Sequence, residues 1–210
     1  LIEAVLGRDV LAIERVTKPA LLRHLFGLSC HHCAQVMSYN KMVGQLQDAG
    51  NTTTLSHYLE LLQRAFLVSG LPRFSGSVVK SRASSPKLVV WNNALVTATL
   101  GNGFEETRHD RALWGRLVEN AVGAHIVNHL HDAGDDVFYF RDGDDEVDFV
   151  LRGGRSVVGL EVKSGSPGKS SGVSTFVKKH DGARALIIGS GGVPLEELFA
   201  EDPRAWLQGA

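Results

Sequence analysis

Three residues in the second half of the sequence have the types and spacing that metal-dependent hydrolysis requires. Asp148 stands inside the apolar run EVDFVL, and Glu161 and Lys163 alternate with apolar residues in GLEVKSG. Side chains two apart on a strand point to one face of the sheet, so Glu161 and Lys163 should project together. Asp148 comes thirteen residues before Glu161, on what should be the neighbouring antiparallel strand. The two carboxylates can therefore converge on one cation.

A fourth residue, Glu119, belongs to the same hypothesis. It shares one face of a predicted helix with Gly123, Ile126, Val127 and Leu130, and this apolar stripe should pack on the sheet. Buried carboxylates need a counter-charge, and oxygen ligands alone favour Mg²⁺ or Mn²⁺ over zinc. We expect Asp148, Glu161 and Glu119 to hold the metal, which would polarise a phosphodiester and acidify a bound water. Lys163 would orient that water or stabilise the developing charge.

The hydrophobic pattern after residue 105 predicts the elements that position these groups. We expect a long helix over residues 111–134 and three strands, DVFYFR, EVDFVLR and SVVGLEVK, joined by the tight turns DGDD and GGR. The helix GVSTFVKKHDGA, the strand RALIIG and the helix PLEELFAED follow. The order αβββαβ predicts an α/β sandwich around a mixed sheet. We place a domain boundary in the polar segment LGNGFEETRHD, which gives domains 1–105 and 106–210.

The first domain should be helical. We expect helices over residues 1–16, from TKPALL to CAQVM, over YNKMVGQLQDAG after a Ser38 cap, and from Asn51 to about Val68. The last of these places Leu55, Leu59, Leu62 and Phe66 on one face and Thr54, Ser56, His57, Glu60 and Gln63 outward. Two short strands, LVSGLPRF and PKLVVWN, follow. This is the order of a winged helix-turn-helix, in which a helix enters a groove of nucleic acid and the hairpin contacts phosphates. A role in protein docking fits the same fold.

The charges are distributed unevenly although the formal net charge is only −1. Residues 61–104 contain no acid, and their five basic residues are the expected nucleic-acid contacts: Arg64, Arg73, Lys80, Arg82 and Lys87. Residues 132–148 contain eight acids against Arg141 alone. The pattern predicts contact with a polyanion, which we expect to be DNA, beside a cation site. Two solvated surfaces would give the same pattern.

Composition sets the class of protein. The 210 residues are 43% hydrophobic and 21% charged, as in ordinary globular proteins. We find no signal peptide and no apolar run of the roughly 18 residues that span a bilayer, so we expect no membrane partner. Two cysteines favour a reducing, cytoplasmic location. Because the chain starts at Leu1 rather than Met, we expect it to be a piece of a longer protein.

Two other motifs suggest different chemistry. The loop GSPGKSSG ends like a phosphate-binding P-loop, but Lys163 stands where that motif requires its first glycine. CHHC at residues 30–33 has one pair of cysteines at zinc-ligand spacing, without a second pair at the right distance. We interpret CHHC as part of a structural helix and place the chemistry in GLEVK.

The motifs also resemble known families. LVENAV, EVDFVL and GLEVKSG resemble the PD-(D/E)XK nuclease superfamily, although Val147 replaces the proline of the motif name. Nearly the whole chain resembles the domain-of-unknown-function family at the carboxy-terminus of prokaryotic AAA+ ATPases, through GRDV, TLSHYLELLQRAFLV, SPKLVVWNNALV and the three segments above. The resemblance implies a winged helix followed by a nuclease-like domain, with Glu119, Asp148, Glu161 and Lys163 as site positions. ATP would bind only to an ATPase domain that precedes this chain.

Two functions follow as hypotheses. The first is a nucleic-acid-binding protein with a Mg²⁺- or Mn²⁺-dependent phosphodiester hydrolase site, working with its own ATPase domain. The second is a catalytically inactive nuclease-like module that binds nucleic acid or protein, because the superfamily contains inactive members.

Overall fold

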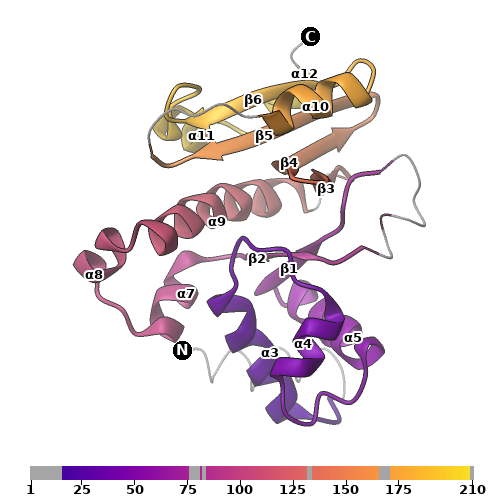
Figure 1. The fold of residues 1–210 in the computed structure, drawn as a ribbon, viewed down its shortest axis with the longest axis vertical. Coiled ribbons are helices and arrows are strands. Elements are labelled where there is room, and N and C mark those ends of the chain that lie inside the picture. The colour runs from indigo at the N-terminus through magenta and orange to yellow at the C-terminus, as the bar shows by residue number, and fades with distance from the viewer. Residues whose placement is uncertain (1–15, 76–80, 82–83, 132–133, 166–170, 209–210) are drawn as a thin grey trace.

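The computed structural model describes residues 16–75, 81, 84–131, 134–165 and 171–208. Helices and strands are mixed, as expected for an α/β protein. A helical part, a two-stranded sheet and a helix-covered four-stranded sheet follow one another along the chain (Figure 1). The helix expected over residues 1–16, Lys80, Arg82 and most of the GSPGKSSG loop lie outside the described residues. No helix in the described part is both long and apolar enough to cross a bilayer.

Three helices of the N-terminal part begin where the sequence predicts. α3 (Pro19–His31) has its proline in the first turn, where the missing N–H costs nothing. α4 (Tyr39–Gln45) and α5 (Thr52–Arg64) follow the caps Ser38 and Asn51. Each cap side chain accepts a hydrogen bond from the main-chain N–H three residues later.

The ends of these helices differ from the prediction. α3 stops before CAQVM because Ala34 adopts a left-handed backbone with φ of 62°, and its N–H donates to Leu88 O. Val36 then forms an antiparallel bridge with Lys87. Phe66, expected on the apolar face of α5, lies beyond the helix with φ of 57° and is 54% exposed. After residue 33 the chain therefore pairs with the strand that contains Lys87 instead of continuing the helix that its apolar periodicity predicted.

The small sheet lies between the helices and the rest of the protein. β1 (Val68–Leu71) and β2 (Lys87–Val90) are antiparallel, as predicted. All four residues of β2 are buried. Leu88 and Val90 belong to the core formed with α3 and α5, whereas Val89 packs in a second core with α9 and the large sheet. Because successive side chains of a strand point to opposite faces, β2 contributes to both cores and connects them.

The second half has the predicted order of elements. α9 precedes three strands, and α10 precedes the fourth strand; two short helices end the described chain. The bounds are α9 Arg111–Leu130, β3 Asp136–Asp142, β4 Asp145–Gly153, β5 Ser156–Lys163, α10 Ser171–Lys179, β6 Arg184–Gly189, α11 Leu195–Ala200 and α12 Arg204–Gln208. β3, β4 and β5 pair antiparallel and β6 pairs parallel with β5, which makes the sheet mixed.

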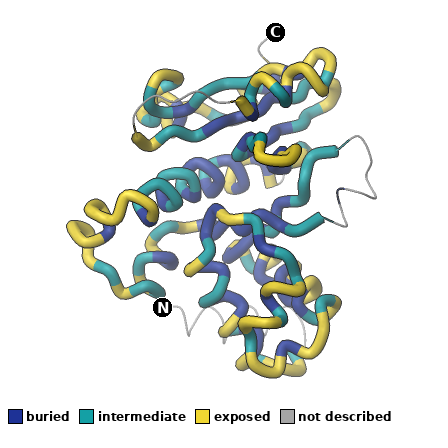
Figure 2. The backbone as a smooth tube through the Cα atoms, viewed as in Figure 1, coloured by how far each residue is buried: buried dark blue, intermediate teal, exposed yellow. Residues whose placement is uncertain are grey.

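Helices cover both faces of the large sheet. The core on one face contains side chains from α9, α11 and α12, including Ile126, Leu198 and Leu207. The opposite face packs Phe176 of α10 over Gly159, where a Cβ atom would lie 2.9 Å from the ring. Buried residues gather along α9, between the small and large sheets (Figure 2).

The segment expected to be a polar domain boundary is partly helical. α7 (Asn93–Leu100) and α8 (Phe104–His109) lie between β2 and α9. Asn92 caps α7 and Gly101 ends it in the left-handed conformation, φ 74°. Leu113 and Leu117 of α9 reach back into the N-terminal core, so the two halves share packing across this segment.

Candidate functional site

Asp148 lies where β4 and β5 separate. The last regular pair is Phe149 with Leu160. Beyond it, Asp148 Oδ2 accepts a hydrogen bond of 2.8 Å from the Val162 N–H. A bulge in β4 opposite Tyr139 places one extra residue at this point, since Phe138 pairs with Val150 and Phe140 with Val147. The carboxylate thus replaces a strand carbonyl and is held rigidly at the edge of the ladder.

The ammonium group of Lys87 lies among the acidic residues. Its Nζ is 2.5 Å from Glu119 Oε1, 3.1 Å from Asp148 Oδ1 and 3.7 Å from Glu146 Oε1. It also donates to the main-chain oxygen of Asp148 at 3.1 Å and lies 5.0 Å from the centre of the Phe149 ring. The Lys87 side chain is 0% exposed. The expectation that Lys87 contacts nucleic acid is therefore wrong, because the packing of β2 aims its side chain into the protein.

Glu161 and Lys163 project together, as predicted. Lys163 Nζ lies 2.6 Å from Glu161 Oε1. Glu161 is only 9% exposed, and its second oxygen, Oε2, is buried without a hydrogen-bond partner among the described residues. A buried carboxylate oxygen without a donor is costly, so Glu161 Oε2 has capacity for a further partner.

Burial and mutual repulsion control the charges. Burial raises the pKa of Glu119 to about 8; Lys87 opposes this rise and Asp148 adds to it. Burial also raises the pKa of Glu161, and the Asp148 charge acts in the same direction. Burial lowers the pKa of Lys87, but Asp148 and Glu119 outweigh it and leave the pKa above its ordinary value. Lys87 is therefore a permanent cation in this site.

The arrangement does not fit a divalent ion while Lys87 is in place. Protein donors already occupy both oxygens of Asp148, Oε1 of Glu119 and Oε1 of Glu161. Among the residues that the structure describes, no three His, Cys, Asp or Glu side chains are grouped so as to hold a metal ion. A divalent ion bound to Asp148 would also be repelled by the Lys87 ammonium a few ångströms away. The predicted ligands converge, but around an ammonium.

A polar cavity of about 610 Å³ opens over this group. Glu119, Asp148 and Glu161 line one side. The other lining residues are His32, Ala34, Gln35, Val36, Met37, Lys41, Gln45, Arg141 and Glu146. Sequence reasoning missed the contribution of residues 32–45. The bridge between Val36 and Lys87 brings them here, and no local sequence signal reports a contact across fifty residues.

The remaining charged residues are distributed differently from the prediction. Arg64 is exposed at the end of α5, and Arg73 is half-buried next to β3, where it bridges Tyr139. Members of the acidic segment form partnerships within the second half. These are Asp136 with Arg152, Asp142 with Lys179, and Asp145 with Thr175. Much of this segment is therefore committed to local contacts rather than to one cation site.

The cysteines of CHHC are buried in the helical core. Burial raises the pKa of Cys30 to about 12 and that of Cys33 to about 11. His31 and His32 contact Gly27 O and Gln35 Oε1 respectively. The thiols behave as small apolar groups, as expected of structural residues. The prediction that CHHC is helical holds only for its first half, because α3 ends at His31.

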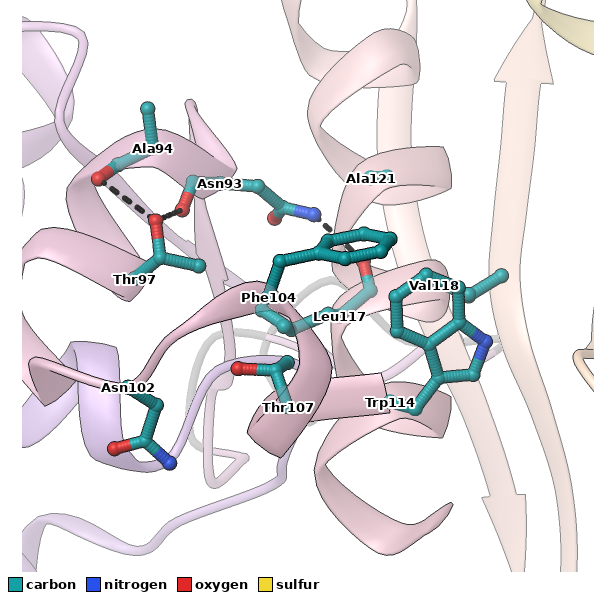
Figure 3. Close-up of a pocket in the computed structure, with 10 residues that line it drawn as sticks. All are labelled: Asn93, Ala94, Thr97, Asn102, Phe104, Thr107, Trp114, Leu117, Val118 and Ala121. Atoms are coloured by element: carbon teal, nitrogen blue, oxygen red, sulfur yellow. Dashed lines mark hydrogen bonds between the residues drawn. The ribbon is translucent and has the colours of Figure 1, made fainter. Parts of the chain in front are cut away.

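A second cavity, of about 490 Å³, is almost entirely apolar and lies between α7, α8 and α9. Phe104, Trp114, Leu117 and Val118 are among its apolar lining residues (Figure 3). Asn93 donates to Leu117 O and Thr97 to Ala94 O, so these polar groups are turned to the main chain (Figure 3). The cavity can accommodate apolar groups but offers no charged side chain for catalysis among its lining residues.

Each half of the chain matches a different family model. Residues 1–106, half of the chain, match the family model described as Domain of unknown function (DUF8612). The chain belongs to the DUF8612 family. Residues 114–196 of this DUF8612 protein match a second model, Domain of unknown function (DUF4143). No curated protein and no solved structure matches the chain.

The acidic group joins the two matched regions. Lys87 lies within the DUF8612 match, whereas Glu119, Asp148, Glu161 and Lys163 lie within the DUF4143 match. The ion pairs of Lys87 therefore connect two sequence families in one DUF8612 protein.

Proposed function

We propose that this DUF8612 protein is a nuclease-like module that binds nucleic acid without cleaving it. In this proposal the N-terminal part is a winged helix, the second half is a PD-(D/E)XK-like domain, and both belong to a larger AAA+ ATPase whose own domain binds ATP. The observation that carries the absence of hydrolysis is the Lys87 ammonium, which contacts Glu119 and Asp148 where a catalytic ion would have to bind.

The surface of α5 supports contact with nucleic acid. Its apolar face is buried in the helical core, and its opposite face is exposed. The exposed residues are Thr53, Ser56, His57, Glu60, Gln63 and Arg64. Hydroxyl, amide and basic side chains suit contacts with phosphates and base edges, and Glu60 is the single acid of this set. The strands of the hairpin are buried, so α5 replaces β2 as the contact element in this proposal.

A binding assay tests this proposal. Fluorescence anisotropy with a labelled DNA duplex should show binding that weakens as salt rises, because phosphate contacts release counterions. Gln63→Ala/Arg64→Ala should weaken binding by about tenfold, a loss of about 1.4 kcal/mol. Arg155→Ala, an exposed arginine in the distant β4–β5 turn, is the matched control and should bind like the parent protein. Equal affinity for all three proteins would contradict the role of α5.

One observation favours the alternative, metal-dependent phosphodiester hydrolysis. Glu161 Oε2 has no hydrogen-bond partner in the described part of the chain, and Lys163 Nζ lies 2.6 Å from Glu161 Oε1. Hydrolysis would then require Lys87 to leave the carboxylates. A nuclease assay with Mg²⁺ or Mn²⁺ should compare the parent chain with Asp148→Ala and Lys163→Ala. Cleavage by the parent that both variants lose would establish the alternative; no cleavage by any of them, with DNA binding retained, supports our proposal.

A further inference from the structure

We propose that Lys87 is the resident cation of the acidic site: it takes the place of a divalent ion, and its removal converts the site into a divalent-cation site. This inference rests on the proposed absence of hydrolysis but concerns ion binding alone. It assigns to a residue of the N-terminal half the electrostatic role that a metal has in a site of this composition.

The first step is that the main chain of Lys87 is held in a fixed position. Lys87 pairs with Leu71 of β1 on one side and with Val36 on the other. The main chain is therefore fixed by hydrogen-bonded neighbours at both edges. Its side chain must then follow the same direction as Val89, which packs near Gly123 of α9 and Phe149 of β4. Strand geometry, and not chance rotamer choice, places the ammonium among the acids.

The second step is the coordination of the ammonium. An ammonium group has three donors. Its three nearest oxygen neighbours are Glu119 Oε1, Asp148 Oδ1 and Asp148 O, at 2.5, 3.1 and 3.1 Å, and Glu146 Oε1 lies further away at 3.7 Å. Phe149 provides a ring face on a further side. This is a complete set of partners for a fully buried lysine, so the group has no need of solvent or of a ligand.

The third step is the charge that would remain without Lys87. Glu119, Asp148 and Glu161 all line the same polar cavity. Lys163 contacts Glu161 Oε1. Glu161 is nine-tenths buried, and its Oε2 has no hydrogen-bond partner among the residues that the structure describes. Without Lys87, these three side chains would leave acidic oxygens of the kind that Mg²⁺ or Mn²⁺ prefers. They are not grouped as metal ligands in the conformation described, so a bound ion would have to draw them together in the space that Lys87 vacates, against the remaining cations Lys163, Lys41 and Arg141. The Lys87 ammonium offsets part of this acidic charge and repels the ion.

Mn²⁺ binding in the absence of nucleic acid tests the inference, by electron paramagnetic resonance of free Mn²⁺ and by calorimetry. The parent protein and the Asp148→Asn variant should have the same Mn²⁺ affinity, because the parent binds no ion at this site. Lys87→Ala should bind one Mn²⁺ at least about tenfold tighter than the parent protein. Lys87→Ala/Asp148→Asn should lose the gain. Circular dichroism establishes which variants fold, and Lys87→Gln replaces Lys87→Ala if the latter does not.

Two outcomes would overturn the inference. One is tight Mn²⁺ binding by the parent protein that Asp148→Asn abolishes. The other is a folded Lys87→Ala or Lys87→Gln protein that binds Mn²⁺ no better than the parent. Neither depends on DNA binding or cleavage, so the proposed function and this inference can fail separately. A parent protein that binds no Mn²⁺ at Asp148, together with a gain in the lysine variant, supports the inference.

Discussion

Asn120 of α9 pairs with the main chain of Val90 as a neighbouring strand would. Its Oδ1 accepts from the Val90 N–H at 2.9 Å, and its Nδ2 donates to Val90 O at 2.8 Å. The side chain is fully buried. Asn120 follows Glu119 directly, so one turn of α9 binds both ends of β2: Glu119 holds the Lys87 ammonium and Asn120 holds the Val90 peptide groups.

Replacing Asn120 should destabilise the protein strongly. Asn120→Ala leaves the N–H and C=O of Val90 buried without partners, and we expect a loss of about 2–4 kcal/mol in the free energy of unfolding. Asn128→Ala, on an exposed position of the same helix, should cost less than about 1 kcal/mol. Urea unfolding of both variants measures the difference. Similar losses would show that the contact with Val90 has no special importance.

Two glycines of α9 should respond oppositely to alanine. A Cβ atom at Gly123 would lie 2.8 Å from the Phe149 ring and 3.1 Å from Val89, so Gly123→Ala should cost about 1–3 kcal/mol. The nearest atom to a Cβ at Gly115 is Ser164 Oγ, at 3.4 Å. Gly115→Ala should therefore gain up to about 1 kcal/mol from helix propensity. Thermal unfolding of both variants checks the signs, and a stabilised Gly123→Ala protein would contradict the close packing of α9.

The buried thiols predict a loss of stability at alkaline pH. Both folded-state pKa values are raised above the ordinary 9.0, so the unfolded chain releases these protons first as pH rises. The stabilisation is complete below pH 9 and is lost as pH rises toward 11 and 12. Between pH 8 and pH 10 each thiol should lower the free energy of unfolding by about 1 kcal/mol. Urea unfolding at both pH values checks this, with Cys30→Ala/Cys33→Ala as the control. If this variant retains the full pH dependence of the parent, the thiols do not cause it.

Local patterns predicted most of the secondary structure. The caps Ser38 and Asn51 set the starts of α4 and α5. The strand-like runs SVVGLEVK and RALIIG predicted the observed bounds of β5 and β6. α7 was missed because its cap, Asn92, lies two residues after the end of β2 at Val90, and the following segment looks like a continuation of the apolar run. This failure arises because the end of a strand and the cap of a helix lie within a few residues of each other.

The site could be predicted only in part. Glu119, Asp148, Glu161 and Lys163 could be placed together because helical and strand periodicities fix which face each occupies. Lys87 could not, because a lysine in PKLVVWN has the same local pattern whether its strand borders solvent or another domain. Its partners are 32 and 61 residues away, at Glu119 and Asp148. Burial of a charge depends on such distant contacts, and the spacing of residues does not record them.

The most direct test of the account is a double-mutant cycle between Lys87 and Asp148, with Lys87→Met, Asp148→Asn and the double variant measured by urea unfolding at pH 7. Each substitution preserves side-chain size, and asparagine can still accept from Val162. Because removal of one partner leaves a buried charge, each single variant should lose about 3–5 kcal/mol. The double variant should lose less than the sum, with a coupling of about 2 kcal/mol or more. Additive losses, within about 0.5 kcal/mol, would contradict the claim that Lys87 neutralises the acidic site.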